Sequence, residues 1–277
     1  MEFIIDSQEG IREPIGMSGV RLEAKVHMVT GAVSAAQNII KCIQRCGLEV
    51  SEIILEQLAS SQSVLTEDEK ELGVCLVDIG GGTTDIAIFT EGAIRFTSVI
   101  PIAGDQVTND IAVALRTPTQ SAEQIKRKHA CALAELASPD ELVEVSGVGD
   151  RPGRTLTKRA LAEVVGPRYE ELFHLVKAEL HRSGFEEFLA AGVVLTGGAS
   201  NVSGSVELAE KIFELPVRLG HPQYIRGNSE VTTNGMYATS TGLLLYGYQQ
   251  QCEQRKPNHV LFGGKIARIK NWLCENF

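Results

Sequence analysis

The chain has 277 residues, a formal net charge of −9, and 43% hydrophobic and 22% charged residues, which is the composition of an ordinary globular protein with room for two compact units. The acidic balance argues against nucleic acid as the main partner, because phosphate contacts require a basic face. No apolar run approaches the roughly 20 residues that span a bilayer, and no signal peptide opens the chain, so we expect the protein to remain in the cytoplasm.

Strand-like and helix-like patterns alternate in the first half of the chain. Residues 51–65 predict a short strand followed by the start of a helix, and Ser34 is a possible N-cap for the helix that Gly47 ends. The other strands are predicted at 21–31, 73–79, 84–90 and 93–104. The other helices are predicted at 34–47, 106–115 and 121–133. Glycine-containing turns separate the last three strands, which should form a meander.

The second half continues the alternation. Residues 140–159 predict a hairpin, and residues 161–184 predict a long helix that Gly184 ends. One face of this helix carries Leu161, Val164, Val165, Leu172, Val176 and Leu180. The remaining elements are predicted as a strand with a glycine loop at 190–204, a helix at 205–216, a strand at 216–220 and a helix at 237–251. The whole pattern predicts α/β architecture in which helices cover the sheets.

Three consecutive glycines follow an apolar strand in the stretch VCLVDIGGGTTDIAIF, residues 74–89. Such a run can present backbone N–H groups to phosphate. The chain lacks the Gly-Lys-Ser/Thr of a P-loop, and a strand follows the glycines where a dinucleotide fingerprint needs a helix. The glycines should therefore lie at the tip of a β-hairpin, where Asp78 could hold the waters of a Mg²⁺ ion. A glycine-rich hairpin without a ligand is the alternative.

A second glycine loop favours the ligand-binding interpretation. Residues 193–200, VVLTGGAS, again run from a buried strand into paired glycines. Between the two loops, the stretch AEQIK predicts a helix that could bring Glu123 and Lys126 to a ribose. Gly104 stands where the backbone must pass close to another group.

The two loops, in this order and with a helical insertion between them, resemble the superfamily of actin, heat-shock ATPases and sugar kinases. Within it, the stretches at 59–90, 159–172, 192–199 and 269–273 resemble the FtsA family of bacterial cell-division proteins. The resemblance covers essentially the whole chain. It implies an actin-like (ribonuclease-H-like) α/β fold with an incomplete first lobe and a C-terminal amphipathic helix.

The resemblance also implies a function. Members of that family bind ATP, self-associate into protofilaments and tether the tubulin-like protein FtsZ to the inner face of the cytoplasmic membrane. We therefore expect a cell-division adaptor that helps to assemble the septum, that lies peripherally on the cell membrane at the division site, and that has at most weak ATPase activity. The implied cofactors are ATP and Mg²⁺. The implied partners are the FtsZ C-terminal tail, further copies of the chain, other divisome proteins and anionic lipids, with no nucleic acid.

Individual roles follow from the same resemblance. The residues implied at the ATP phosphates and Mg²⁺ are Asp78 (through water to Mg²⁺), Gly80, Gly81, Gly82, Thr83 and Gly104. The residues implied at the adenosine are Glu123, Lys126, Gly197, Gly198 and Ala199. The FtsZ tail is expected on subdomain 2B, at Arg159, Arg168 and Glu171.

The family's subdomains can be assigned along the chain. The assignment is 1–46 to a remnant of subdomain 1C, 47–71 to a remnant of 1A, 72–100 and 190–234 to 2A, 101–189 to 2B, 235–250 to a helix returning to 1A, 251–262 to a linker and 263–277 to a membrane-targeting helix. The family's first phosphate hairpin has no counterpart here. We therefore expect that roughly the first third of a family member is absent and that ATP binding is weak or lost.

Residues 263–277 are basic and apolar in an otherwise acidic chain. At about 100° per residue, one arc of a helix carries the apolar side chains of Ile266, Ile269, Trp272, Leu273 and Phe277. The basic residues of the segment are Lys265, Arg268 and Lys270. An apolar face with basic edges suits the surface of an anionic membrane. A helix docked on its own domain is the alternative.

Two other functions compete with the adaptor. An actin-fold sugar kinase would need a carboxylate base beside an acceptor pocket, and Asp85 is the nearest candidate. An interaction module without nucleotide binding is the third possibility. Turnover of hexoses with ATP would separate the kinase from the other two.

Overall fold

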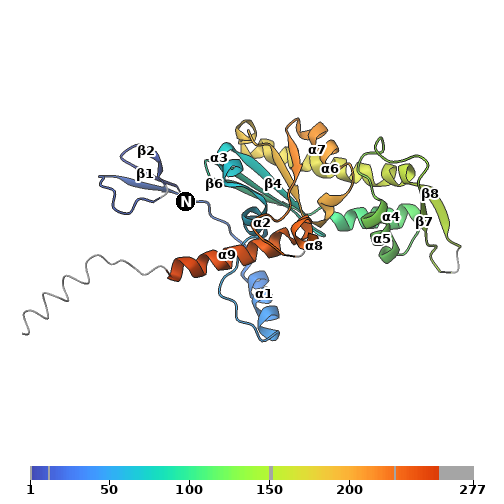
Figure 1. Cartoon of the computed structure of the whole chain (residues 1–277), viewed down its shortest axis with the longest axis horizontal. Coiled ribbons are helices and arrows are strands. Elements are labelled where there is room, and N and C mark those ends of the chain that lie inside the picture. Colours follow the sequence, from blue (N-terminus) through green and yellow to red (C-terminus); the bar gives the residue numbers. More distant parts are fainter. Residues whose placement is uncertain (1, 12, 150–151, 228, 256–277) are drawn as a thin grey trace, which may run out of the picture.

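The computed structural model describes residues 2–11, 13–149, 152–227 and 229–255 (Figure 1). Its centre is a five-stranded sheet in the order β10-β9-β4-β5-β6. The strands are β4 (Val74–Ile79), β5 (Thr84–Thr90), β6 (Ala93–Ile100), β9 (Val193–Thr196) and β10 (Val217–Leu219). Strands β4, β5 and β6 are antiparallel neighbours, so the predicted meander is confirmed, and β9 joins β4 in parallel.

Both faces of this sheet are covered, which explains why β4 and β5 are nearly continuous apolar runs. Alternate residues of β4 enter two different cores: Val77 packs with residues of α4, α6 and α7, whereas Leu76 packs with Val64, Leu65 and Ala238. The first layer contains α6 (Lys158–Ser183) and α7 (Ser205–Phe213), and the second contains α2 (Glu56–Val64) and α9 (Ala238–Arg255) (Figure 1).

Helix α6 confirms the long helix predicted at 161–184. Thr157 caps it by accepting a hydrogen bond from the Ala160 N–H at 3.2 Å, and Gly184 ends it in the left-handed conformation with φ +71°. Five of the six residues predicted on its apolar face are buried and Val164 is half-buried. The buried face lies on the sheet and on α4.

A smaller unit extends from one end of the sheet (Figure 1). It contains α4 (Gly104–Leu115), α5 (Thr119–His129) and the antiparallel hairpin of β7 (Leu142–Val145) and β8 (Arg154–Thr157). The hairpin predicted at 140–159 is therefore confirmed, and β8 runs directly into α6.

The first fifty residues depart most from expectation. Strands β1 (Glu2–Ile5), β2 (Gln8–Ile11) and β3 (Leu22–Lys25) form a separate sheet, and α1 (Val33–Arg45) has no buried residue. The strand predicted at 21–31 ends at Lys25, because that residue pairs with Glu2 at the end of β1. The N-cap prediction at Ser34 was wrong: the cap position is Ala32, which supplies no side-chain hydrogen bond.

Two boundaries differ for local reasons. The short strand predicted within 51–65 does not form, since no neighbouring strand is available there, and only α2 is present, from Glu56. Helix α9 continues to Arg255, so the first five residues of the linker predicted at 251–262 are helical. Four of these five residues are Gln, Glu or Arg, which are good helix formers, and the first strong breaker after them in the sequence is Pro257. Two short α-helices are α3 (Glu67–Leu72), which Thr66 and Glu69 cap reciprocally, and α8 (Ser229–Thr232).

Candidate functional site

The two predicted glycine loops leave the sheet side by side. Strands β4 and β9 are parallel, with Asp78 opposite Thr196, so both strands end at the same edge. Beyond that edge lie the β4–β5 turn at residues 80–83 and the β9 loop at 197–198. The carboxyl edge of parallel strands is the usual place for a ligand in an α/β sheet.

The β4–β5 turn is open on its outer side. The Gly80 N–H donates to the Thr83 carbonyl at 3.0 Å, and the start of α4 holds the turn through Gly104 N–H to Gly80 O and Asp105 N–H to Gly81 O, at 3.1 and 2.7 Å. Gly81 and Gly82 are exposed, and no acceptor within the described chain takes their N–H groups. Two amides therefore remain available to an anion.

The β9 loop, in contrast, is packed tightly. Gly197 has φ +88°, and a Cβ placed on it would lie 2.4 Å from the Ile79 carbonyl oxygen and 2.5 Å from Asp78 Oδ1. The Tyr169 hydroxyl, brought by α6, donates to the Ala199 carbonyl at 2.7 Å. The Ser200 hydroxyl donates to the Gly197 carbonyl at 2.7 Å. These bonds fix the path of the loop.

Helix α5 brings Glu123 and Lys126 to the same place. The Lys126 ammonium is buried and donates to the Gly104 carbonyl at 2.9 Å and the Thr108 hydroxyl at 2.8 Å, and it pairs with Glu123 at 2.7 Å. Burial alone would raise the pKa of Glu123, but bonds from Lys126 and Thr108 hold that pKa below its usual value. The ion pair is thus fixed and charged, with the Glu123 side chain still 41% exposed.

The close approach predicted at Gly104 is present. A Cβ at this position would lie 3.1 Å from the Gly80 carbonyl oxygen, 3.2 Å from Lys126 Nζ and 3.3 Å from the Ala199 Cβ. Gly104 therefore lets the hairpin, α5 and the β9 loop meet around one point.

Carboxyl groups gather below the hairpin. Burial raises the pKa of Asp78, a shift that the Ser60 hydroxyl opposes and the nearby Glu56 reinforces. Burial and then Glu56 raise the pKa of Asp85 to about 6. Excess negative charge at a partly buried place is what a bound cation would stabilise.

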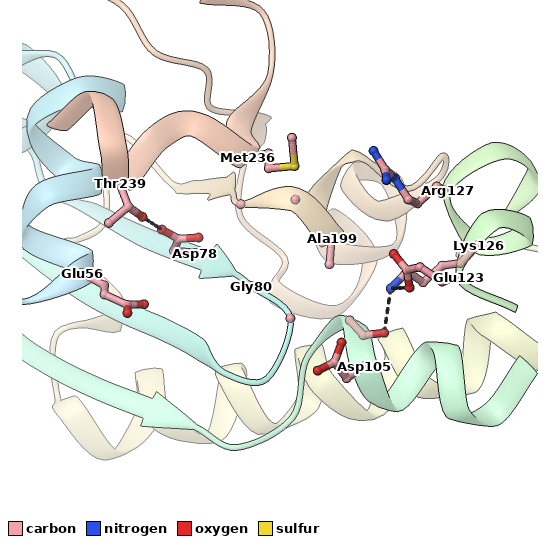
Figure 2. A pocket seen from close by; sticks show the side chains of 14 residues that line it. Glu56, Asp78, Gly80, Asp105, Glu123, Lys126, Arg127, Ala199, Met236 and Thr239 are labelled. Atoms are coloured by element: carbon pink, nitrogen blue, oxygen red, sulfur yellow. Dashed lines mark hydrogen bonds and ion pairs between the residues drawn. The ribbon is translucent and has the colours of Figure 1, made fainter. Parts of the chain in front are cut away.

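The two glycine loops, the Glu123–Lys126 pair, Asp78 and Glu56 line one cavity of about 380 Å³, shown in Figure 2. Nine of its lining residues were predicted, namely Asp78, Gly80, Gly81, Gly104, Glu123, Lys126, Gly197, Gly198 and Ala199. Gly82, Thr83 and Asp85 are not among the lining residues.

Five lining residues were missed by sequence reasoning: Glu56, Asp105, Arg127, Met236 and Thr239. Asp105 and Arg127 directly follow two predicted residues, so their neighbours in sequence were a usable signal. Met236 lies in the segment just before α9, and Thr239 lies at the start of α9 (Figure 2). No sequence motif marks either residue. Only the fold brings them to the cavity.

A metal ion bound directly by protein side chains is not indicated. Among the residues that the structure describes, no group of three His, Cys, Asp or Glu side chains has the arrangement of a metal site. The donor chemistry does fit a hydrated Mg²⁺ held through water, since Asp78, Asp105 and Glu56 offer carboxylate oxygens to the same cavity.

The residues predicted for FtsZ lie on α6, away from the lining of this cavity. Arg168 makes a bidentate pair with Asp110 of α4, at 2.6 and 3.0 Å, and a further bond to Glu171 at 2.6 Å. Arg159 is exposed and has no partner among the described residues. The membrane-binding residues predicted at 263–277 lie outside the described residues, and none of the described helices has the length and apolar content needed to cross a bilayer.

Comparisons with known proteins agree with this architecture. A family model described as "Cell division protein FtsA" matches residues 75–242, and one described as "SHS2 domain inserted in FTSA" matches residues 1–30. The chain is 69% identical over 286 residues to the cell division protein FtsA of Pseudomonas aeruginosa, an alignment that covers 100% of this chain and 68% of that protein.

Two solved structures are similar in fold. MreB5 of Spiroplasma citri bound to ADP has a TM-score of 0.66 at 17% identity, over 82% of this chain and 68% of that one. The MamK double helical filament has a TM-score of 0.57 at 16% identity, over 79% of this chain and 66% of that one. Likeness at this identity concerns the fold, which is actin-like. The chain belongs to the FtsA family of cell-division proteins.

Proposed function

We propose that the cavity binds an adenine nucleotide with hydrated Mg²⁺. We also propose that the protein acts as a membrane-associated adaptor for FtsZ. The observation that carries the nucleotide proposal is the convergence of two glycine loops and the Glu123–Lys126 pair on one cavity. Amides that lack an internal acceptor suit phosphates, and a fixed ion pair suits ribose hydroxyls. The MreB5 structure of the same fold was solved with ADP.

Each part of the nucleotide has a proposed partner. The amides of Gly81 and Gly82 would face the phosphates, and Asp78 would hold a water of the Mg²⁺ ion. Glu123 and Lys126 would contact the ribose. The exposed Gly198 and the Met236 side chain would form the wall for the base. Mg²⁺ would supply charge neutralisation between the phosphates and the carboxylates, with at most slow hydrolysis.

Calorimetric titration of the 277-residue chain with ADP and ATP, with and without Mg²⁺, tests this proposal. Among the described residues, the β4–β5 turn is the one hairpin whose glycine amides are proposed to bind phosphate. We therefore expect the dissociation constant for the nucleotide to be weaker than micromolar. Micromolar binding would contradict the need for a second phosphate hairpin. No heat and no chemical-shift change at millimolar nucleotide would reject the site.

The adaptor role is inferred from membership of the FtsA family. The FtsZ tail has groups of both signs, so a helix face offering Arg159, Arg168 and Glu171 is a chemically suitable dock. Arg168 is already paired with Asp110, whereas Arg159 has no partner among the residues that the structure describes, so Arg159 should give the larger electrostatic contribution. We expect Arg159→Glu to weaken binding of an FtsZ tail peptide in fluorescence anisotropy. Equal affinity for wild type, Arg159→Glu and Arg168→Glu would reject this surface.

Membrane association is proposed for residues 263–277. Trp272 is the only tryptophan in the chain, so its fluorescence reports this segment alone. Full burial of one apolar side chain is worth roughly 1.5 to 3 kcal/mol, and ordering the segment removes much of that gain, so a single copy should bind weakly. Many copies in one assembly would bind firmly, and a filament of this fold is known for MamK. We expect a blue shift on anionic vesicles that Ile269→Glu abolishes; no shift at any lipid concentration would reject the anchor.

A further inference from the structure

The carboxylate of Asp78 joins three elements that are far apart in the sequence. The Ser60 hydroxyl of α2 donates to Asp78 Oδ2 at 2.5 Å. The Thr239 hydroxyl of α9 lies 3.4 Å from the same oxygen, a contact that Figure 2 shows as a dashed line. The two hydroxyls are themselves 3.0 Å apart, although 179 residues separate them in the chain. Ser60 is fully buried, so its hydrogen bond has no competition from water.

The other oxygen of Asp78 faces the candidate site. Asp78 Oδ1 would lie only 2.5 Å from a Cβ on Gly197, so this oxygen is directed at the β9 loop. Asp78 also lines the cavity. One carboxylate therefore binds the two helices through Oδ2 and presents Oδ1 toward the site.

Helices α2 and α9 approach each other unusually closely beneath the hairpin. A Cβ on Gly242 would lie 1.7 Å from the Ala59 carbonyl oxygen, so the two backbones are nearly in contact. A second link, from the Ser63 hydroxyl to the Ala238 carbonyl at 2.7 Å, joins the same helices without touching Asp78. The crossing thus has one cluster of links, formed by Ser60, Thr239 and Asp78, and a separate link at Ser63 that does not involve Asp78.

We propose that Ser60 and Thr239 are positioning residues that orient Asp78 toward the hydrated cation and thereby couple occupancy of the site to helix α9. The inference rests on the proposed nucleotide function. A cation near Oδ1 favours one orientation of the carboxylate, and that orientation is the one in which Oδ2 meets both hydroxyls. Coupling of this kind is reciprocal. If the cation stabilises the α2–α9 crossing, then an ordered crossing raises the affinity for the cation by the same free energy. The described part of helix α9 ends at Arg255.

Hydrogen exchange of the whole chain, with and without millimolar Mg²⁺-ADP, tests the coupling. In wild type we expect slower exchange at the 80–83 turn and also at α2 and at the first turns of α9. Ser60→Ala should lower the affinity for Mg²⁺-ADP by about tenfold, the worth of one hydrogen bond to a charged group, and remove the response of α9. Affinity for ADP in EDTA should be unchanged, because the lost hydroxyl acts through the cation.

Two matched controls separate positioning from packing. Ser63→Ala removes a buried hydroxyl that bridges the same helices, and it should leave the Mg²⁺ dependence and the response of α9 intact. Thr239→Val keeps the shape of the side chain and removes the hydroxyl, whereas Thr239→Ser keeps the hydroxyl and removes the methyl group. Only Thr239→Val should weaken the hydrogen-exchange response of α9. Thr239 is half-buried, so this pair remains informative if Ser60→Ala does not fold.

The outcomes also separate this inference from the proposed function. Slower exchange at residues 80–83 without any change in α9 would overturn the coupling and leave the nucleotide site standing. An equal loss of the α9 response in Ser63→Ala and Ser60→Ala would show that packing, not Asp78, carries the signal. Unchanged exchange everywhere in wild type, with no calorimetric binding, would overturn both.

Discussion

The two glycine loops of the site need glycine for different reasons. In the β9 loop, Gly197 has a backbone conformation that side chains rarely adopt and no room for a Cβ, so glycine is required by the fold itself. In the β4–β5 turn, a Cβ on Gly82 would meet nothing within 4 Å, and its φ lies outside the left-handed region. A glycine that the fold does not require is a better indication of a ligand than one that it does. The difference leads to three predictions, given in order of decreasing effect.

Replacement of Gly197 by alanine should cause the largest loss of stability. The new Cβ would overlap the Ile79 carbonyl and Asp78, and the backbone conformation would be strained. We expect the free energy of unfolding to fall by about 2 to 5 kcal/mol in urea denaturation. Gly198→Ala is the control, because its Cβ would make an ordinary contact at 3.6 Å with Met236 and should cost below about 1 kcal/mol. Equal losses in the two variants would contradict the tight packing of the loop.

Asparagine at position 85 should stabilise the protein at neutral pH. The pKa of Asp85 in the folded state is about 6, above the unfolded value of about 4, so the folded state binds more protons between these values. The free energy of unfolding therefore falls as pH rises through that window. We expect Asp85→Asn to raise it by about 1 kcal/mol at neutral pH.

The comparison of unfolding curves at about pH 4 and at neutral pH checks the Asp85 prediction. The stabilisation by Asp85→Asn should be much smaller at the lower pH, where the wild-type carboxyl is protonated in the folded state and about half protonated in the unfolded state. A variant that is less stable than wild type at neutral pH would show that the charged carboxylate is favourable in the fold.

Alanine at position 82 should have the smallest effect on stability, within about 0.5 kcal/mol, because the new methyl group enters open space. It should nevertheless weaken nucleotide binding, by about tenfold, since a methyl group keeps phosphate from the backbone. Calorimetry on Gly82→Ala, with its urea curve as the control for folding, makes the measurement. Unchanged affinity together with unchanged stability would leave the glycine triplet without a role at the ligand.

The sequence predicted those parts of the molecule that local patterns determine. The meander of β4, β5 and β6, the hairpin of β7 and β8 and the C-terminal end of α6 follow from alternation, turn residues and a glycine stop over short spans, whereas α6 begins three residues before the predicted start. Both glycine loops and the Glu123–Lys126 pair follow from motifs, and the cavity unites them. What could not be predicted depends on distant pairing: Glu56, Met236 and Thr239 reach the cavity only because α2 and α9 cross under the sheet.

Charge pairing was equally hidden from sequence. Nothing in the stretch around Arg168 shows that its guanidinium is held by Asp110 on another helix. In α1 the pattern gave a helix, yet burial needs a neighbouring surface, and no residue of α1 is buried by the described chain. Periodicity predicts which face of a helix is apolar, and only the tertiary structure shows what covers it.

The parallel pairing of β4 with β9 has a consequence for how the chain folds. Strands β4 to β6 are joined by short turns and can pair as soon as residue 100 has left the ribosome, whereas β4 cannot pair with β9 until residue 196 is present. Contacts between distant residues form slowly because a long loop must close first. We therefore expect the edge beside the hairpin to stay open during synthesis and the cavity to be completed late, when β9 and then α9 arrive. Pulse-labelled hydrogen exchange during refolding should protect the amides of β5 before those of β9; simultaneous protection would mean that the sheet forms in one step.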